Sequence, residues 1–290
     1  MSTTDGTSAE FRADRFVRQQ SAFRELEFER PEPDRFHLYV SLACPWAHRI
    51  VIARRILGLE DLLPMTVVDP IRDERGWRFT PGEPDPVNGY GFLAEAYHAT
   101  DPRFRGRVTV PTLFDKRAGR VFNNESADQL RMLNAWSTDG PDLYPEALRE
   151  EIDAVNARVY EQVNNGVYRA GFPRSQAAYD EAVTDVFNGL DWLEERLGTR
   201  RYLIGDQITE ADWRLFTTLV RFDAVYAIHF KCSIRRIADY PGLSRLLRDL
   251  YHQPGVAATV DVDQIKRHYY GTHPSLNPSG IVPAGPALDL

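Results

Sequence analysis

The side chain best suited to chemistry in this chain is the thiol of Cys44, in the segment Cys44-Pro45-Trp46-Ala47. The apolar stretch 36–40 precedes it and predicts a short strand. Pro45 suits the first position of a helix, and apolar residues then recur at helical spacing. Cys44 would therefore face the unpaired N–H groups and the positive end of a helix dipole. Both favour the thiolate, which is the nucleophilic form of cysteine.

Alternatively, Cys44 could be an unreactive core residue, because cysteine is often a small buried hydrophobe. The order strand, Cys-Pro, helix favours the reactive one. Ala47 stands where a dithiol oxidoreductase would carry its second cysteine, so the motif cannot close a disulfide. Cys232 lies far along the chain, and nothing in the sequence pairs it with Cys44. A mixed disulfide on Cys44 would then be resolved by a thiol from solution, for which glutathione is the abundant cytosolic candidate.

Two further motifs could hold such a ligand. Val110-Pro111 interrupts a predicted strand, and a cis bond there would turn the backbone groups of Val110 toward a peptide ligand. A trans proline on an edge strand is the alternative. Glu125 and Ser126 open a predicted helix, where they could hold the ammonium and carboxylate groups of a γ-glutamyl end. The same pair would also make an ordinary helix cap.

The segment 69–88 is a long predicted loop with four prolines and little periodicity. Loops of this length inside a compact domain are usually functional or disordered. Trp77 and Phe79 are residues that disordered segments tend to lack. We therefore expect an active-site loop.

The order of elements predicts the fold. A second strand at 62–68 follows the Cys44 helix, and this spacing predicts a parallel βαβ unit. A short helix at 92–98, strands at 108–114 and from Val121, and a helix from Ser126 complete a thioredoxin-like α/β domain. From about residue 147 the pattern predicts helices only, at 152–163, 179–197, 210–226, 243–250 and 262–270. Thr209 and Asp212 would form a capping box on the third of these helices.

The predicted elements divide the chain into four segments. An N-terminal extension would cover residues 1–33, with 3–8 loose and its aromatic residues packed on the body of the protein. The thioredoxin-like domain would cover 34–140, the all-helical domain 146–273, and a tail 274–290.

The composition limits the class of protein, its partners and its location in the cell. A hydrophobic content of 43% and a charged content of 27% are typical of a soluble globular protein. A net charge of −7 and the lack of a long basic block argue against a nucleic-acid partner. Two cysteines, no signal-peptide pattern in residues 1–30 and no bilayer-length apolar run favour a cytoplasmic location and no membrane partner. No cluster of His, Cys and Asp has metal-ligand spacing, so we expect no metal.

Several blocks of this sequence, taken together and in order, resemble the glutathionyl-hydroquinone reductases, the Xi class of glutathione transferases. The resemblance runs from about Phe11 to His273. The blocks are Cys44-Pro45-Trp46-Ala47-His48-Arg49, Gly76-Trp77-Arg78-Phe79, Val110-Pro111-Thr112-Leu113, Asn123-Asn124-Glu125-Ser126, 165–172, 221–226, 229–232 and 265–270.

The resemblance implies a thioredoxin-like domain, an all-helical domain, a homodimer and the reduction of glutathionyl-hydroquinones with glutathione as co-substrate. Cys44 would attack the sulfur of the conjugate and release the hydroquinone, and a second glutathione would regenerate the thiolate. The implied glutathione contacts are Trp77, Val110, Glu125 and Ser126, with Arg107 a weaker candidate. The implied aromatic pocket is Tyr168, Tyr226 and Tyr269, with Tyr270 left open as an alternative to Tyr269.

Tyrosine hydroxyls suit that reaction. They can donate to a phenolic oxygen as charge develops, and they can deliver a proton to a ring carbon. For any single tyrosine, packing with one hydrogen bond is the commoner role.

Two other functions compete with this one. An Omega-like transferase or dehydroascorbate reductase would use the same single thiol on another acceptor. A non-enzymatic interaction module with this fold would not need a reactive cysteine at all.

Overall fold

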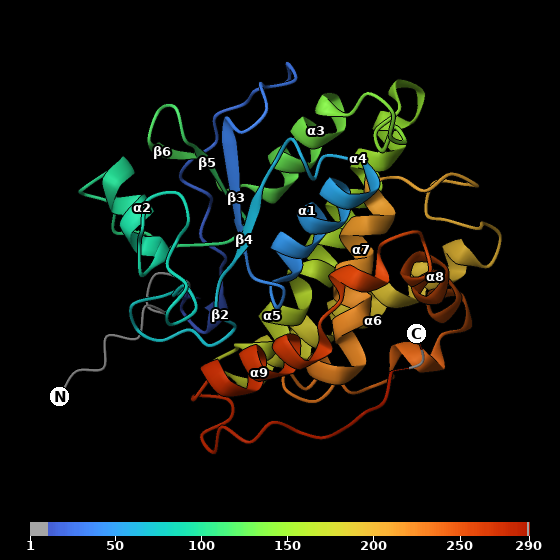
Figure 1. Cartoon of the computed structure of the whole chain (residues 1–290). Coiled ribbons are helices and arrows are strands. Elements are labelled where there is room, and N and C mark those ends of the chain that lie inside the picture. Colours follow the sequence, from blue (N-terminus) through green and yellow to red (C-terminus); the bar gives the residue numbers. More distant parts are fainter. Residues whose placement is uncertain (1–10, 289) are drawn as a thin grey trace. The chain divides into compact units, whose positions relative to one another are not determined.

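The computed structural model describes residues 11–288 and 290 (Figure 1). The predicted loose segment 3–8 lies outside them. The chain forms two compact units. Unit 1 comprises Gln19–Pro141 and Ala258–Thr272, and unit 2 comprises the described residues up to Arg18, Asp142–Ala257 and the residues from His273 onward. The domain boundaries expected from the sequence stay a prediction.

Unit 1 is built on a four-stranded sheet in the order β4-β3-β5-β6. Its strands are β3 (Phe36–Val40), β4 (Met65–Val67), β5 (Thr112–Asp115) and β6 (Arg120–Asn123). β3 pairs with β4 in parallel, which confirms the predicted βαβ unit, and the other pairs are antiparallel. Strand β5 begins later than predicted, at Thr112, because the preceding Pro111 has no N–H to give to the ladder.

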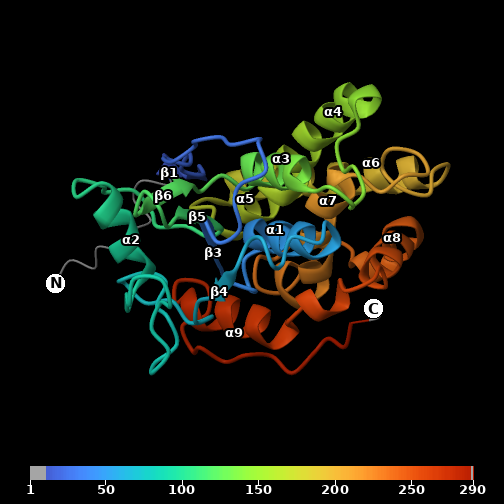
Figure 2. The ribbon, with the colours of Figure 1, turned by 45° about the horizontal axis from the view of Figure 1, so that its top comes forward.

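Helices α1 (Pro45–Ile56) and α3 (Ser126–Trp136) lie side by side in unit 1, as Figures 1 and 2 both show. Pro45 is the first residue of α1, as predicted, and Gly58 follows the helix end with φ +65°. Two more helices belong to this unit, α2 (Leu93–Thr100) and α9 (Val262–Thr272).

The long loop between β4 and α2 is ordered. The buried carboxylate of Asp85 accepts a hydrogen bond from the Tyr39 hydroxyl at 2.8 Å and from the backbone N–H groups of Val87 and Asn88. The Phe79 ring packs edge-on against Tyr39, with 5.6 Å between centroids. The loop is therefore tied to β3 by a buried polar centre and an aromatic contact.

The N-terminal extension of unit 1 runs along the outer edge of the sheet. Phe23 exchanges hydrogen bonds with Asn124, and the Trp136 indole N–H donates to the Glu27 carbonyl at 2.8 Å. This confirms, for its described residues, that the extension lies on the body of the protein. Phe28 differs from the expectation for the aromatic residues, because its side chain is 52% exposed.

Unit 2 contains a short hairpin of β1 (Phe11–Arg12) and β2 (Arg15–Phe16), and then helices. The longer ones are α4 (Arg149–Val159), α6 (Gln176–Leu197), α7 (Glu210–Arg221) and α8 (Pro241–Tyr251). Thr209 and Asp212 form the predicted capping box at the start of α7. Burial raises the pKa of the Asp212 carboxyl to about 6.

Two predicted helices of unit 2 change type near their ends. The π-helical turn η3 (Tyr160–Asn164) continues α4, and the π-helical turn η4 (Phe222–Tyr226) continues α7. The short helix α5 (Gly166–Gly171) follows η3 and was not predicted, because six residues that begin and end with glycine carry too little periodicity. No helix among the described residues is long and apolar enough to cross a membrane.

Candidate active site

Cys44 occupies the N-cap position of α1 in an extended conformation, with φ −79° and ψ 122°. Its N–H donates to the Ser41 carbonyl at 3.0 Å, and its own carbonyl accepts from the N–H of His48 at 2.9 Å. The half-buried Sγ lies 3.4 Å from the carbonyl oxygen of Val110, to which the thiol donates. The sulfur thus sits at the positive end of a twelve-residue helix.

The Val110–Pro111 bond is cis, as the sequence predicted. It lies just before β5 and brings the Val110 carbonyl to Cys44. The buried Gln129 side chain donates to the carbonyls of Pro111, at 3.4 Å, and Asn123, at 3.0 Å. The buried amide of Gln129, on α3, therefore holds Pro111 and the end of β6 against that helix.

Glu125 is the N-cap residue of α3, and Ser126 is the first residue of that helix. One carboxylate oxygen of Glu125 accepts from the N–H of Ala127 at 3.0 Å, so it caps the helix. The other accepts from the Ser21 hydroxyl at 2.9 Å. Ser21 was not predicted, because nothing in the pattern of the extension indicates a contact 104 positions away. Ser126 is buried, and Glu125 is half-buried.

Trp77 lies in the long loop, with its side chain 4% exposed. Its indole stacks on the ring of His268 from α9, with 5.0 Å between centroids and 21° between planes. The guanidinium of Arg72 lies 5.6 Å from the Trp77 ring centre. Trp77 is therefore held in place by cationic and aromatic neighbours from its own loop and from α9.

The remaining predicted residues of unit 1 lie on α9 and before β5. Tyr269 and Tyr270 are both buried, so burial does not choose between them. Burial raises the pKa of the Tyr270 hydroxyl to about 12. The backbone N–H of the half-buried Arg107 donates to the side-chain oxygen of Gln19 at 2.9 Å.

Unit 2 brings Tyr168 and Tyr226 together. Their ring centroids are 6.1 Å apart, and Phe230 packs on both rings, at 5.3 Å and 5.4 Å. Tyr168 is half-buried, and Tyr226 is fully buried. Tyr168 lies on α5 directly after one π-helical turn, and Tyr226 ends the other. Such turns are frequent at functional sites, since they shift side chains out of helical register.

The second cysteine has a different environment. Cys232 is fully buried in unit 2, and its Sγ lies 3.9 Å from the Phe230 carbonyl. Burial raises the pKa of the Cys232 thiol to about 12. Both cysteines are free thiols. A buried protonated thiol is chemically inert, which leaves Cys44 as the candidate nucleophile.

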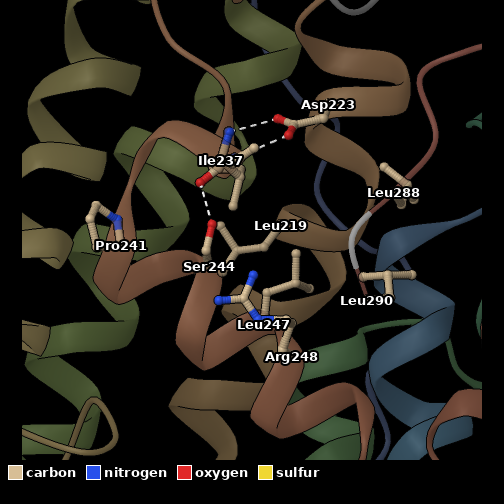
Figure 3. A pocket seen from close by; sticks show the side chains of 10 residues that line it. Leu219, Asp223, Ile237, Pro241, Ser244, Leu247, Arg248, Leu288 and Leu290 are labelled. Atoms are coloured by element: carbon tan, nitrogen blue, oxygen red, sulfur yellow. Dashed lines mark hydrogen bonds between the residues drawn. The ribbon is translucent and has the colours of Figure 1, made fainter.

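Unit 2 also contains a pocket between α7 and α8, which Figure 3 shows. The Asp223 carboxylate accepts from the N–H groups of Ile237 and Ala238, and the Ser244 hydroxyl donates to the Ile237 carbonyl. Leu288 and Leu290 of the tail line the same pocket. The Asp223 and Ser244 side chains thus bind the local backbone, and the pocket contains none of the predicted site residues. Among the residues that the structure describes, no group of three His, Cys, Asp or Glu could hold a metal ion.

The matches to family models agree with this fold. The model for the N-terminal domain of glutathione S-transferases matches residues 43–136, and the model for their C-terminal domain matches residues 176–249. The class of protein is therefore a glutathione transferase, with the predicted thioredoxin-like and all-helical parts.

Individual relatives show which class of glutathione transferase this chain resembles. The glutathionyl-hydroquinone reductase PcpF of Sphingobium chlorophenolicum is 52% identical over 95% of this chain and 91% of its own length. The glutathione-bound structure of YqjG from Escherichia coli K-12 is 51% identical, covers 89% of this chain and 87% of its own, and has a TM-score of 0.86. The Xi glutathione transferase of Phanerochaete chrysosporium is 45% identical over 93% and 97%, with a TM-score of 0.90. This chain belongs to the glutathionyl-hydroquinone reductases, the Xi class of glutathione transferases.

Proposed function

We propose that this protein is an enzyme that reduces glutathionyl-hydroquinones to hydroquinones, with glutathione as co-substrate and Cys44 as the nucleophile. The observation that carries the proposal is the Cys44 thiol at the N-cap of α1, in a chain 52% identical to a glutathionyl-hydroquinone reductase. Ala47 supports a single-thiol mechanism, because no second cysteine follows in the motif.

The first step transfers the glutathionyl group to the enzyme. The Cys44 thiolate attacks the sulfur of the conjugate, a disulfide forms between Cys44 and glutathione, and the bond from that sulfur to the ring carbon breaks. The electron pair of the broken bond stays on the ring carbon, which takes up a proton, and the hydroquinone leaves. The dipole and N–H groups of α1 favour the attacking thiolate.

The second step regenerates the enzyme. The thiolate of a second glutathione attacks the glutathione sulfur of the mixed disulfide, Cys44 leaves as a thiolate, and oxidised glutathione is released. The two glutathionyl groups supply the electrons that reduce the conjugate, so the cycle needs no metal and no other cofactor.

For the glutathione site we propose Trp77, Arg107, Val110, Glu125 and Ser126. Val110 is suited to pair with the peptide backbone next to the sulfur, since its carbonyl lies 3.4 Å from Cys44. Glu125 is suited to bind the γ-glutamyl ammonium, and Ser126 at the start of α3 to bind the carboxylate beside it. Arg107 and Trp77 would bind the remaining carboxylate and amide groups.

For the aromatic part of the substrate we propose Tyr168, Tyr226 and Tyr269. A tyrosine hydroxyl can stabilise the negative charge that develops on a phenolic oxygen, and it can deliver the proton that the ring carbon needs. The proximity of Tyr168 and Tyr226 in unit 2 supports a joint role for these two. We further propose a cytoplasmic homodimer.

The proposal is tested by supplying a glutathionyl-hydroquinone with excess glutathione and measuring hydroquinone and oxidised glutathione. We expect turnover by the wild type and none by Cys44→Ser. The matched control is Cys232→Ala, which removes the buried thiol and should keep the activity. Equal turnover by Cys44→Ser would refute the mechanism. A clear preference for dehydroascorbate over the conjugate would favour the Omega-like alternative.

A further inference from the structure

Arg18, just after the N-terminal hairpin of unit 2, lies against Tyr168. Its guanidinium carbon is 4.5 Å from the centre of the Tyr168 ring and 5.5 Å from the centre of the Phe16 ring. The Phe16 ring itself stacks on Tyr168, with 6.4 Å between centroids and 25° between planes. The cation therefore lies close to the phenol, beside a second aromatic ring.

A hydrogen bond fixes the guanidinium in this place. The Nε of Arg18 donates to the Oδ1 of Asn165 at 2.9 Å. Asn165 is the N-cap residue of α5, and its carbonyl accepts from the N–H of Tyr168 at 3.1 Å. The residue that holds Arg18 thus also begins the helix that carries Tyr168, so the charge and the ring are positioned by one turn of backbone.

Other titratable groups surround Tyr168. Arg15, next to Phe16, pairs with Glu181 of α6, and Arg169 of α5 pairs with Glu181 and Asp185 of α6. These arginines are compensated by carboxylates. After η4, burial lowers the pKa of His229 to about 4, so it is neutral at pH 7, and its Nε2 lies 3.1 Å from the Nδ1 of His273. The titratable groups on the packed elements include Asp14, Arg15, Arg169, Glu181, Asp185, Asp223, Tyr226, His229, Lys231 and His273.

We propose that Arg18 is a positioning residue that holds a positive charge over Tyr168 and strengthens its hydroxyl as the proton donor of the reaction. A cation over the face of a phenol is attracted to the ring, and the same charge stabilises the phenolate that forms when the proton leaves. This inference rests on the proposed function, because it assigns Tyr168 a proton to give. It adds a residue outside the blocks that carry the family resemblance.

The test compares two replacements of similar length. Arg18→Lys keeps the charge, and Arg18→Met keeps most of the packing without it. In the reductase assay we expect the kcat of Arg18→Met to fall about tenfold, the change that one pKa unit corresponds to. The kcat of Arg18→Lys should fall much less, and the KM for glutathione should stay the same in both. Equal kcat values for the two variants would overturn the proposal, since a purely structural role depends on packing and not on charge.

A second measurement does not depend on turnover. Protein labelled with ¹³C at the tyrosine Cζ is titrated by NMR, with the Tyr168 signal assigned through Tyr168→Phe. We expect the ionisation of Tyr168 to move about one pH unit upward in Arg18→Met and to stay near the wild-type position in Arg18→Lys. An unmoved midpoint would overturn the proposal, as would a shifted midpoint with unchanged kcat. Activity in Cys44→Ser would instead refute the proposed function and leave this titration valid.

Discussion

The two cysteines of this chain have opposite environments. Cys44 is half-buried at the N-cap of α1, where the backbone offers N–H groups and a positive dipole end. Cys232 is fully buried after the left-handed residue Lys231, and its Sγ donates to the Phe230 carbonyl at 3.9 Å. A helix N-terminus stabilises a thiolate, whereas full burial in an apolar site stabilises the thiol.

The two cysteines differ in the backbone around the sulfur and in burial. The residue type alone would predict the same thiol reactivity for Cys44 and Cys232. A Pro-led helix start makes one of them a candidate nucleophile, and burial raises the pKa of the other to about 12. This difference between the two thiols predicts distinct effects on turnover, thiol labelling and stability.

The largest effect should come from removing the sulfur itself. We expect Cys44→Ser to lower reductase turnover by at least about 10⁴-fold, because a serine hydroxyl cannot form the mixed disulfide. Cys232→Ala should keep turnover within about twofold, measured under the same conditions. A comparable loss in Cys232→Ala with the fold intact would contradict the assignment.

The next largest difference should be in the rates at which the two thiols react with a labelling reagent. With a disulfide reagent at pH 7, one thiol of the native protein should react, and Cys44→Ser should lose it. Cys232 should react at least about 10³-fold more slowly, since exposing a core group requires an opening of the structure. Labelling of both thiols should follow unfolding in guanidinium chloride. Two fast thiols in the native protein would show that Cys232 is accessible.

A smaller effect should come from Glu125, the proposed site for the ammonium group of glutathione. Glu125→Gln keeps the size of the side chain and removes its charge. We expect the KM for glutathione to rise about 30-fold, in line with the loss of a charge-assisted hydrogen bond. The thiol labelling rate of Cys44 should not change, which serves as the internal control. An unchanged KM would exclude Glu125 from glutathione binding.

The buried thiol also predicts a dependence of stability on pH. The folded-state pKa of Cys232 is raised to about 12 from an ordinary value of 9.0, so only the unfolded state ionises between these values. The stabilisation is therefore complete below pH 9 and is lost as the pH rises toward 12. Between pH 9 and 10 we expect the free energy of unfolding to fall by about 1 kcal/mol more in the wild type than in Cys232→Ala. Urea titrations at the two pH values measure this, and an equal fall in the free energy of unfolding for wild type and Cys232→Ala would contradict it.

The smallest effect should come from the N-terminal extension. The Ser21 hydroxyl donates to the Glu125 carboxylate at 2.9 Å, so Ser21→Ala removes one hydrogen bond that orients it. We expect about a threefold higher KM for glutathione with kcat unchanged. In a Glu125→Gln background the same substitution should have a smaller effect, as a double-mutant cycle would show.

Much of the fold could be predicted from local patterns. The strand at Phe36–Val40, the helix that Pro45 begins, the parallel pairing of β3 with β4 and the cis Val110–Pro111 bond all follow from short stretches of sequence. The π-helical turns η3 and η4 could not be predicted. The hydrophobic period of a helix barely changes over five residues, so the pattern gives no sign of the extra residue in the turn.

The sequence by itself therefore determined the candidate nucleophile and the helix that follows it, since the propensity of proline and the spacing of apolar residues act over a few positions. Only the tertiary structure decided which distant groups surround the site residues. Ser21 reaches Glu125, and Arg18 reaches Asn165 and Tyr168, across more than one hundred positions of chain. Such contacts depend on how whole elements pack, and no local pattern encodes them. The same holds for Cys232, because the burial that raises the pKa of its thiol outweighs the opposing charge of its sequence neighbour Lys231.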